Sequence, residues 1–202
     1  TSKSNHVSAA EAGSAAPKAL QSALPEEKRL TAYHEAGHAV IAEVLTPESV
    51  SIVSVKRHDG STAGFTVNCL TDDYWNSMDD MENRVISILG GKAATEIVYG
   101  KVDVGSASDI RRATSIVDRF VVDYCAYGFD SCNERGCEPS VNTANMRDFE
   151  IHNELLTYYN KAKRILINNR EFVDKMVALL MEKETITYND IQQIKATCKI
   201  VR

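Results

Sequence analysis

The stretch His-Glu-Ala-Gly-His at residues 34–38 constrains this chain more than any other. It lies in a helical pattern, because apolar residues recur with the spacing of one helix face. The stripe consists of Leu30, Tyr33, Gly37, Val40, Ile41 and Val44. Pro25 suits a first helical turn, so we expect a helix from Pro25 to about Leu45. His34 and His38 share one face at the border of the stripe, where side chains should be half buried.

Two imidazoles on one helix face suit a zinc ion, and two histidines of a three-ligand set leave a position for water. Glu35 stands beside the first ligand and could accept a proton from that water. His-Glu-x-x-His is the signature of zinc proteases. The alternative is a surface helix with two unrelated histidines, but their place beside the apolar stripe weighs against it.

Composition describes an ordinary globular chain. Its 202 residues are 44% hydrophobic and 25% charged, which is enough to bury a core in one domain. A net charge of -5 gives no reason to expect a nucleic-acid partner. No apolar run approaches the roughly 18 residues of a membrane segment, and no secretory signal is present. The five scattered cysteines indicate reduced thiols. We expect a cytoplasmic protein, or a soluble domain of a membrane-anchored one.

Two regions are predicted along the chain. Residues 1–24 are rich in Ala and Ser and are interpreted as a flexible tail or linker. Residues 25–202 form one domain, in which Val50–Lys56 and Gly64–Leu70 should pair as a hairpin. Its exposed edge could hold an extended peptide by strand addition, or the sheet could merely cover the first helix. The predicted fold is mainly α with a small β-sheet (α+β), a helical zincin-type metallopeptidase domain.

Amphipathic patterns predict five further helices. These cover residues 77–100, 109–128, 148–169, 171–184 and 187–198. Ser77 and Thr187 begin the first and last of them as capping residues. Residues 129–145 read as a long loop, in which Cys132 and Cys137 are interpreted as unpaired thiols rather than as a second metal or redox site.

A catalytic zinc needs a third protein ligand, and two carboxylates are candidates. Glu96 lies in a helix whose apolar face includes its neighbours. Asp109 lies at a helix start after a Gly/Ser loop, where the helix dipole favours an ionised carboxylate. Either one could be the ligand and the other a partner that orients a histidine, so residue chemistry leaves both open.

Three stretches in the same order and rough spacing resemble the peptidase domain of the FtsH family of zinc metalloproteases. They are residues 33–40 (Tyr-His-Glu-Ala-Gly-His-Ala-Val), 89–100 (Leu-Gly-Gly-Lys-Ala-Ala-Thr-Glu-Ile-Val-Tyr-Gly) and 105–114 (Gly-Ser-Ala-Ser-Asp-Ile-Arg-Arg-Ala-Thr). The resemblance runs from about Pro25 to near the C-terminus. It implies that His34, His38 and Asp109 bind Zn2+, that Glu35 is the general base, and that Glu96 is a nearby carboxylate that supports the ligands without binding the metal.

This chain departs from the family in two respects. The ATPase module and transmembrane segments of FtsH proteins are absent before the peptidase, so we expect either a piece of a longer chain or a stand-alone member. The family's Gly-Met-Ser run is replaced by Gly-Phe-Asp-Ser at 128–131, followed by a Cys-containing insertion. The insertion bears on substrate range and regulation.

We therefore predict a zinc metalloendopeptidase that hydrolyses unfolded or flexible polypeptides, with an ATPase or unfoldase outside this chain as a partner for folded substrates. One alternative is a zinc-containing regulatory or binding module, inactive without an ATPase; the intact Glu35 argues against it. Another is a structural zinc domain, which usually has four ligands, often cysteines. Whole FtsH proteins are hexamers, so a homo-oligomeric ring, a dimer and a monomer all stay open.

Overall fold

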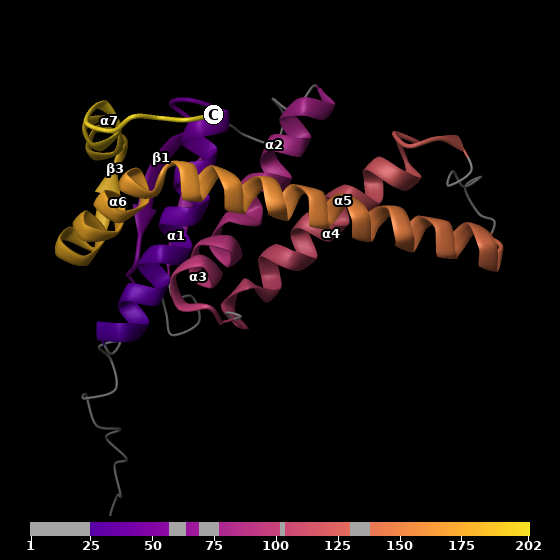
Figure 1. Ribbon diagram of the computed structural model, residues 1–202, viewed down its shortest axis with the longest axis horizontal. Helices are drawn as coiled ribbons and strands as arrows, with labels where there is room; N and C mark the ends of the chain where they lie inside the picture. Colours follow the sequence, from indigo (N-terminus) through magenta and orange to yellow (C-terminus); the bar gives the residue numbers. More distant parts are fainter. Residues whose placement is uncertain (1–24, 57–63, 69–76, 102–103, 130–137) are drawn as a thin grey trace, which may run out of the picture.

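The computed structural model describes residues 25–56, 64–68, 77–101, 104–129 and 138–202. These residues form helices and a small sheet (Figure 1). The helices are α1 (Pro25–Leu45), α2 (Met78–Ile88), α3 (Gly90–Tyr99), η3 (Val104–Ser106, a 3-10 turn), α4 (Ala107–Val122), α5 (Val141–Asn168), α6 (Arg170–Lys183) and α7 (Tyr188–Ala196). The strands are β1 (Val50–Ser54), β2 (Phe65–Asn68) and β3 (Thr185–Thr187). The α+β class is as predicted, whereas the predicted tail and the Cys132/Cys137 loop lie outside the described residues.

Helix α1 is the centre of the fold, with α3 and α6 on different sides of it (Figure 1). Its bounds are those predicted. It can pack so closely because Gly37 faces Gly90 of α3: a Cβ on Gly37 would lie 2.4 Å from the Gly90 carbonyl oxygen. The missing side chain thus lets α3 approach the histidine-bearing face of α1.

The sheet lies against α1 and has the strand order β2-β1-β3, with both pairs antiparallel. The predicted hairpin of β1 and β2 is present. Strand β3 was not predicted. It is three residues long, too short for an alternating pattern, and it follows Glu184, whose backbone is left-handed (φ 63°) and ends α6.

Helix α7 is tied back to α1 by a buried carboxylate. Glu43 is fully buried and accepts hydrogen bonds from the Lys195 ammonium (2.8 Å) and the Gln192 amide (3.0 Å). It also accepts from the backbone N–H of Val50 (3.0 Å) and Glu48 (3.1 Å). Because a buried charge is stable only with such partners, this network fixes α7 and β1 on α1.

The predicted continuous helix over 77–100 is instead two helices, α2 and α3, which meet at Leu89. Hydrogen bonds run across this joint, since Leu89 N–H donates to Val85 and Ala93 N–H donates to Leu89. The chain therefore bends rather than breaks, as helices commonly do at glycine pairs such as Gly90-Gly91.

Two helix ends also differ from the prediction. Helix α4 ends at Val122 instead of Gly128. Helix α5 begins at Val141, seven residues before the predicted Asp148, and Ser140 caps it by accepting from the Thr143 N–H. With 28 residues, α5 is about 42 Å long and reaches far to one side of the molecule (Figure 1).

The expectation of reduced thiols throughout is wrong for one cysteine. Cys125 is disulfide-bonded, whereas Cys198 is a free cysteine as predicted. Within the described part of the chain, no helix is both long and apolar enough to cross a membrane.

Candidate metal centre

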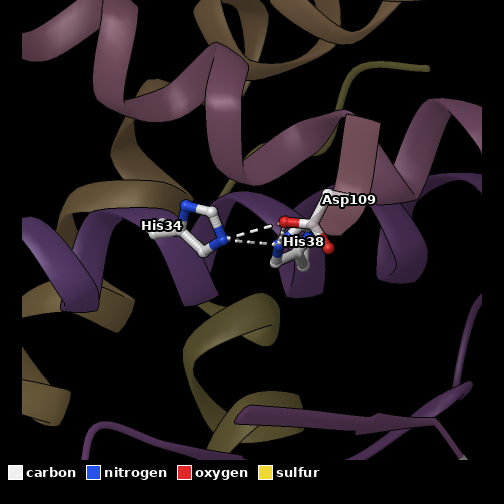
Figure 2. Close-up of side chains that lie close together, drawn as sticks. All are labelled: His34, His38 and Asp109. Atoms are coloured by element: carbon white, nitrogen blue, oxygen red, sulfur yellow. Dashed lines mark hydrogen bonds and ion pairs between the residues drawn. The ribbon is translucent and has the colours of Figure 1, made fainter. Parts of the chain in front are cut away.

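Three side chains from two helices converge at one point (Figure 2). His34 and His38 project from the same face of α1, one turn apart. Asp109 lies in the first turn of α4, 75 residues further along the chain than His34. The Nε2 atoms of the two histidines are 3.0 Å apart, and the Asp109 Oδ2 lies 3.1 Å from His34 Nε2 and 3.4 Å from His38 Nε2.

These separations fit a metal ion. Nitrogen and oxygen ligands that surround Zn2+ tetrahedrally at about 2.0–2.1 Å stand roughly 3.3 Å from one another. Two imidazoles and one carboxylate form a known type of catalytic ligand set for zinc. Gly91 also keeps the adjoining space open, because a Cβ there would lie 2.5 Å from His38 Nε2 and 2.6 Å from His34 Nε2.

A backbone carbonyl orients one of the two imidazoles. His38 Nδ1 lies 2.8 Å from the carbonyl oxygen of Ser87 in α2. A carbonyl can only accept, so Nδ1 carries the proton and Nε2 is left with its lone pair toward the ligand cluster. No residue pattern could have identified this partner, since every residue has a carbonyl and only the packing of α2 on α1 selects Ser87.

Glu35 lies next to the cluster and is only 7% exposed. Its Oε2 accepts a hydrogen bond of 2.8 Å from the hydroxyl of Thr66, in the middle of β2. The sheet therefore contacts the side chain that the sequence proposes as general base. Thr66 carries no motif and was not singled out from the sequence.

Electrostatics in the cluster favour an ionised carboxylate. Burial of Asp109 acts to raise its pKa, but hydrogen bonds from His34 and His38 outweigh burial, and the pKa lies well below its usual range. For His38, burial lowers the pKa, while Asp109 and the charge of Glu35 raise it by more. Because an imidazole binds a metal only in its neutral form, a metal ion at this site competes with a proton for His38.

Comparison with known proteins identifies the family. The model of peptidase family M41 matches residues 21–194. This chain belongs to peptidase family M41. The ATP-dependent zinc metalloprotease FtsH of Thermotoga maritima is 33% identical over 187 residues, which cover 84% of this chain. The ATP-dependent zinc metalloprotease FtsH 2 of Thermoanaerobacter sp. (strain X514) is 29% identical over 86% of this chain.

This M41 chain spans about a third of the length of those relatives, 31% of the Thermotoga maritima protein and 34% of the Thermoanaerobacter protein. The similarity runs through the described helices and the sheet, including α1 and α4, which carry the converging side chains.

Glu96, the other carboxylate predicted near the metal, is held by a different set of residues in this M41 chain. Its oxygens accept hydrogen bonds from Lys92 (2.8 Å), Lys163 (2.6 Å) and the Tyr159 hydroxyl (2.5 Å). Two of these donors come from α5, so Glu96 joins α3 to α5. None of its described hydrogen bonds reaches a histidine, and its predicted role beside the metal ligands stays a prediction.

Proposed function

We propose that this chain is a zinc metalloendopeptidase that hydrolyses peptide bonds of unfolded or flexible polypeptides. The observation that carries the proposal is the convergence of His34, His38 and Asp109, whose ligand atoms all lie within 4.8 Å of one another. Glu35 follows His34 in α1, and the charge of its carboxylate acts on His38. The membership in peptidase family M41 and the names of its relatives support the same activity.

The three converging side chains would hold Zn2+ through two neutral imidazoles and an ionised carboxylate. A zinc ion there supplies Lewis acidity, which polarises the scissile carbonyl and lowers the pKa of a water that attacks it. Glu35 accepts the proton of this water and delivers it to the amine of the leaving segment. Water is thus divided between the new carboxyl group and the new amino group, and Glu35 returns to its ionised state.

The substrate is proposed to bind in an extended form along the sheet. Among the described residues, β2 pairs with β1 on one side only, and Thr66 of β2 touches Glu35. A peptide that adds to the outer edge of β2 would lie beside the base, and such pairing recognises backbone rather than sequence. Folded proteins offer no such segment, so we propose that an ATPase or unfoldase outside these residues prepares them.

The test is cleavage of a permanently unfolded protein, such as a reduced and alkylated one, by the zinc-loaded chain and by Glu35→Gln. We expect cleavage by the wild type and none by the variant, with equal zinc content in both by metal analysis. A stable folded protein should be cut far more slowly than its unfolded form. Bound zinc without cleavage by the wild type would contradict the proposal and favour a regulatory or binding module.

A further inference from the structure

The chain just before β2 packs closely against the side chain of Glu35. Gly64, just before β2, is buried, and a Cβ there would lie 2.9 Å from Glu35 Cγ and 2.8 Å from Thr31 Cγ2. The backbone of Gly64 therefore runs directly against this face of α1. Only a residue without a side chain lets the strand approach Glu35 so closely.

Two residues further on, Thr66 contacts the carboxylate itself. Its hydroxyl donates to Glu35 Oε2 at 2.8 Å and lies 3.3 Å from the Glu35 backbone oxygen. The shorter contact, to a charged acceptor, is the stronger of the two. Of the hydrogen bonds described for this structure, it is the one that the Glu35 carboxylate accepts from another side chain. Because Glu35 as a whole is only 7% exposed, a donor from the protein matters more to its carboxylate than it would at the surface.

We propose that Thr66 is a positioning residue for the base of the proposed peptidase, an inference that rests on the function proposed above. Glu35 has three rotatable side-chain bonds. Gly64 restricts the first part of the side chain at Cγ, and Thr66 fixes the carboxylate by binding Oε2. The other oxygen, Oε1, is then presented to the attacking water in one orientation. Loss of such an orienting partner typically lowers activity by about 10- to 100-fold.

Two substitutions separate the hydroxyl from the shape of the side chain. Thr66→Val keeps the branched shape and suits a strand, but it removes the donor. Thr66→Ser keeps the donor with a smaller side chain. Ser51→Ala is the matched control. The Ser51 hydroxyl donates to the Val67 carbonyl (2.9 Å) in the same sheet, so this substitution removes a hydroxyl from the sheet without removing a hydrogen bond to Glu35.

The first measurement is kcat and KM of the zinc-loaded chain on an unfolded protein. We expect Thr66→Val to lower kcat by at least about tenfold with KM within about twofold, because binding of substrate does not use the hydroxyl. Thr66→Ser and Ser51→Ala should stay within about threefold of wild type, with zinc content unchanged throughout. Equal losses in Thr66→Val and Thr66→Ser would overturn the proposal, since shape rather than the donor would then matter.

The second measurement needs neither zinc nor activity. In the metal-free chain, Thr66→Val should lower Tm by about 2–4 °C when Glu35 is present. The drop should be clearly smaller in a Glu35→Met background, which lacks the carboxylate and keeps only the longer contact to the backbone oxygen of residue 35. An equal drop in Tm in both backgrounds would show that the hydrogen bond from Thr66 to the Glu35 carboxylate does not stabilise the protein, and would overturn the proposal. An inactive wild type would overturn the proposed function together with the positioning role, whereas an active wild type with a fully active Thr66→Val overturns the positioning role alone.

Discussion

A methyl group added at Gly37 tests how closely α3 crosses α1. Such a substitution has two effects of opposite sign on the free energy of unfolding. Alanine is favoured over glycine in a helix interior by about 1 kcal/mol. If Gly37 faced open space, Gly37→Ala would therefore stabilise the protein by about that amount. The structure predicts the reverse.

The size of the opposing effect follows from the contact. A Cβ on Gly37 would lie 2.4 Å from the Gly90 carbonyl oxygen and 2.7 Å from Ala94 Cβ, whereas an ordinary contact begins at 3.4 Å. One neighbour is a backbone atom and the other a Cβ, and no side-chain rotation can move either away, so the helices must separate by about 1 Å. Overpacking of this kind costs about 1–3 kcal/mol, and here we expect the upper end. The net loss is about 2 kcal/mol, or about 4–8 °C in Tm.

The assay is thermal and urea unfolding of the metal-free chain, so that metal binding does not contribute. Gly90→Ala examines the same contact from the other helix, because a Cβ there would lie 2.6 Å from the Gly37 carbonyl oxygen. It should destabilise as well, and the double variant should lose less than the sum of the two, since the helices separate only once. A gain in stability for Gly37→Ala would refute the reasoning.

Three further outcomes follow from charged groups. Lys195→Met should destabilise the fold by about 3–5 kcal/mol in urea unfolding, because it leaves the buried Glu43 carboxylate without its cation; a loss under 1 kcal/mol would contradict this. Hydrogen bonds from Lys163, Lys92 and Tyr159 lower the pKa of Glu96 from 4.5 to about 2, so this carboxylate stabilises the fold above pH 4.5 and less as the pH falls toward 2. Glu96→Gln should thus be less stable by about 1–2 kcal/mol at pH 7, after allowance for solvent screening, and a gap that does not narrow below pH 4.5 would contradict this. Asp109→Asn should weaken zinc binding in a competition titration with a chelator much more than Glu96→Gln, and equal losses would leave Asp109 unsupported as third ligand.

Local patterns were sufficient for the part of the site on α1. His34 and His38 share a face because four residues complete about one helical turn, and the apolar stripe places that face at the edge of the core. Asp109 is different, since residue chemistry could not choose between it and Glu96. Both lie in helices, and only the packing of α3 and α4 brings one toward the histidines and turns the other toward α5.

The helices and strands that were predicted correctly depend on neighbouring residues, and those that were not depend on residues distant in sequence. Helix α1 has a proline start and a continuous stripe, and α7 has a capping box, so both were predicted from neighbouring residues alone. The first turns of α5 have no apolar periodicity, and β3 exists because β1 offers an edge with which its three residues can pair. These elements depend on partners distant in sequence, which a local pattern does not reveal.

Close approach to α1 is the property that the sequence expresses least. Three glycines allow such approaches. Gly37 lies at the crossing of α1 with α3, Gly91 lies beside the imidazole nitrogens, and Gly64 lies against Glu35. Each glycine is plain in the sequence. The reason that it has no side chain is the neighbouring atom that a Cβ would meet, and only the folded structure shows that atom. Gly37 is unfavourable in an isolated helix by about 1 kcal/mol, yet it allows the crossing that brings Gly91 to the histidines. A helix optimised for its own stability at this position would therefore push α3 away and widen the site.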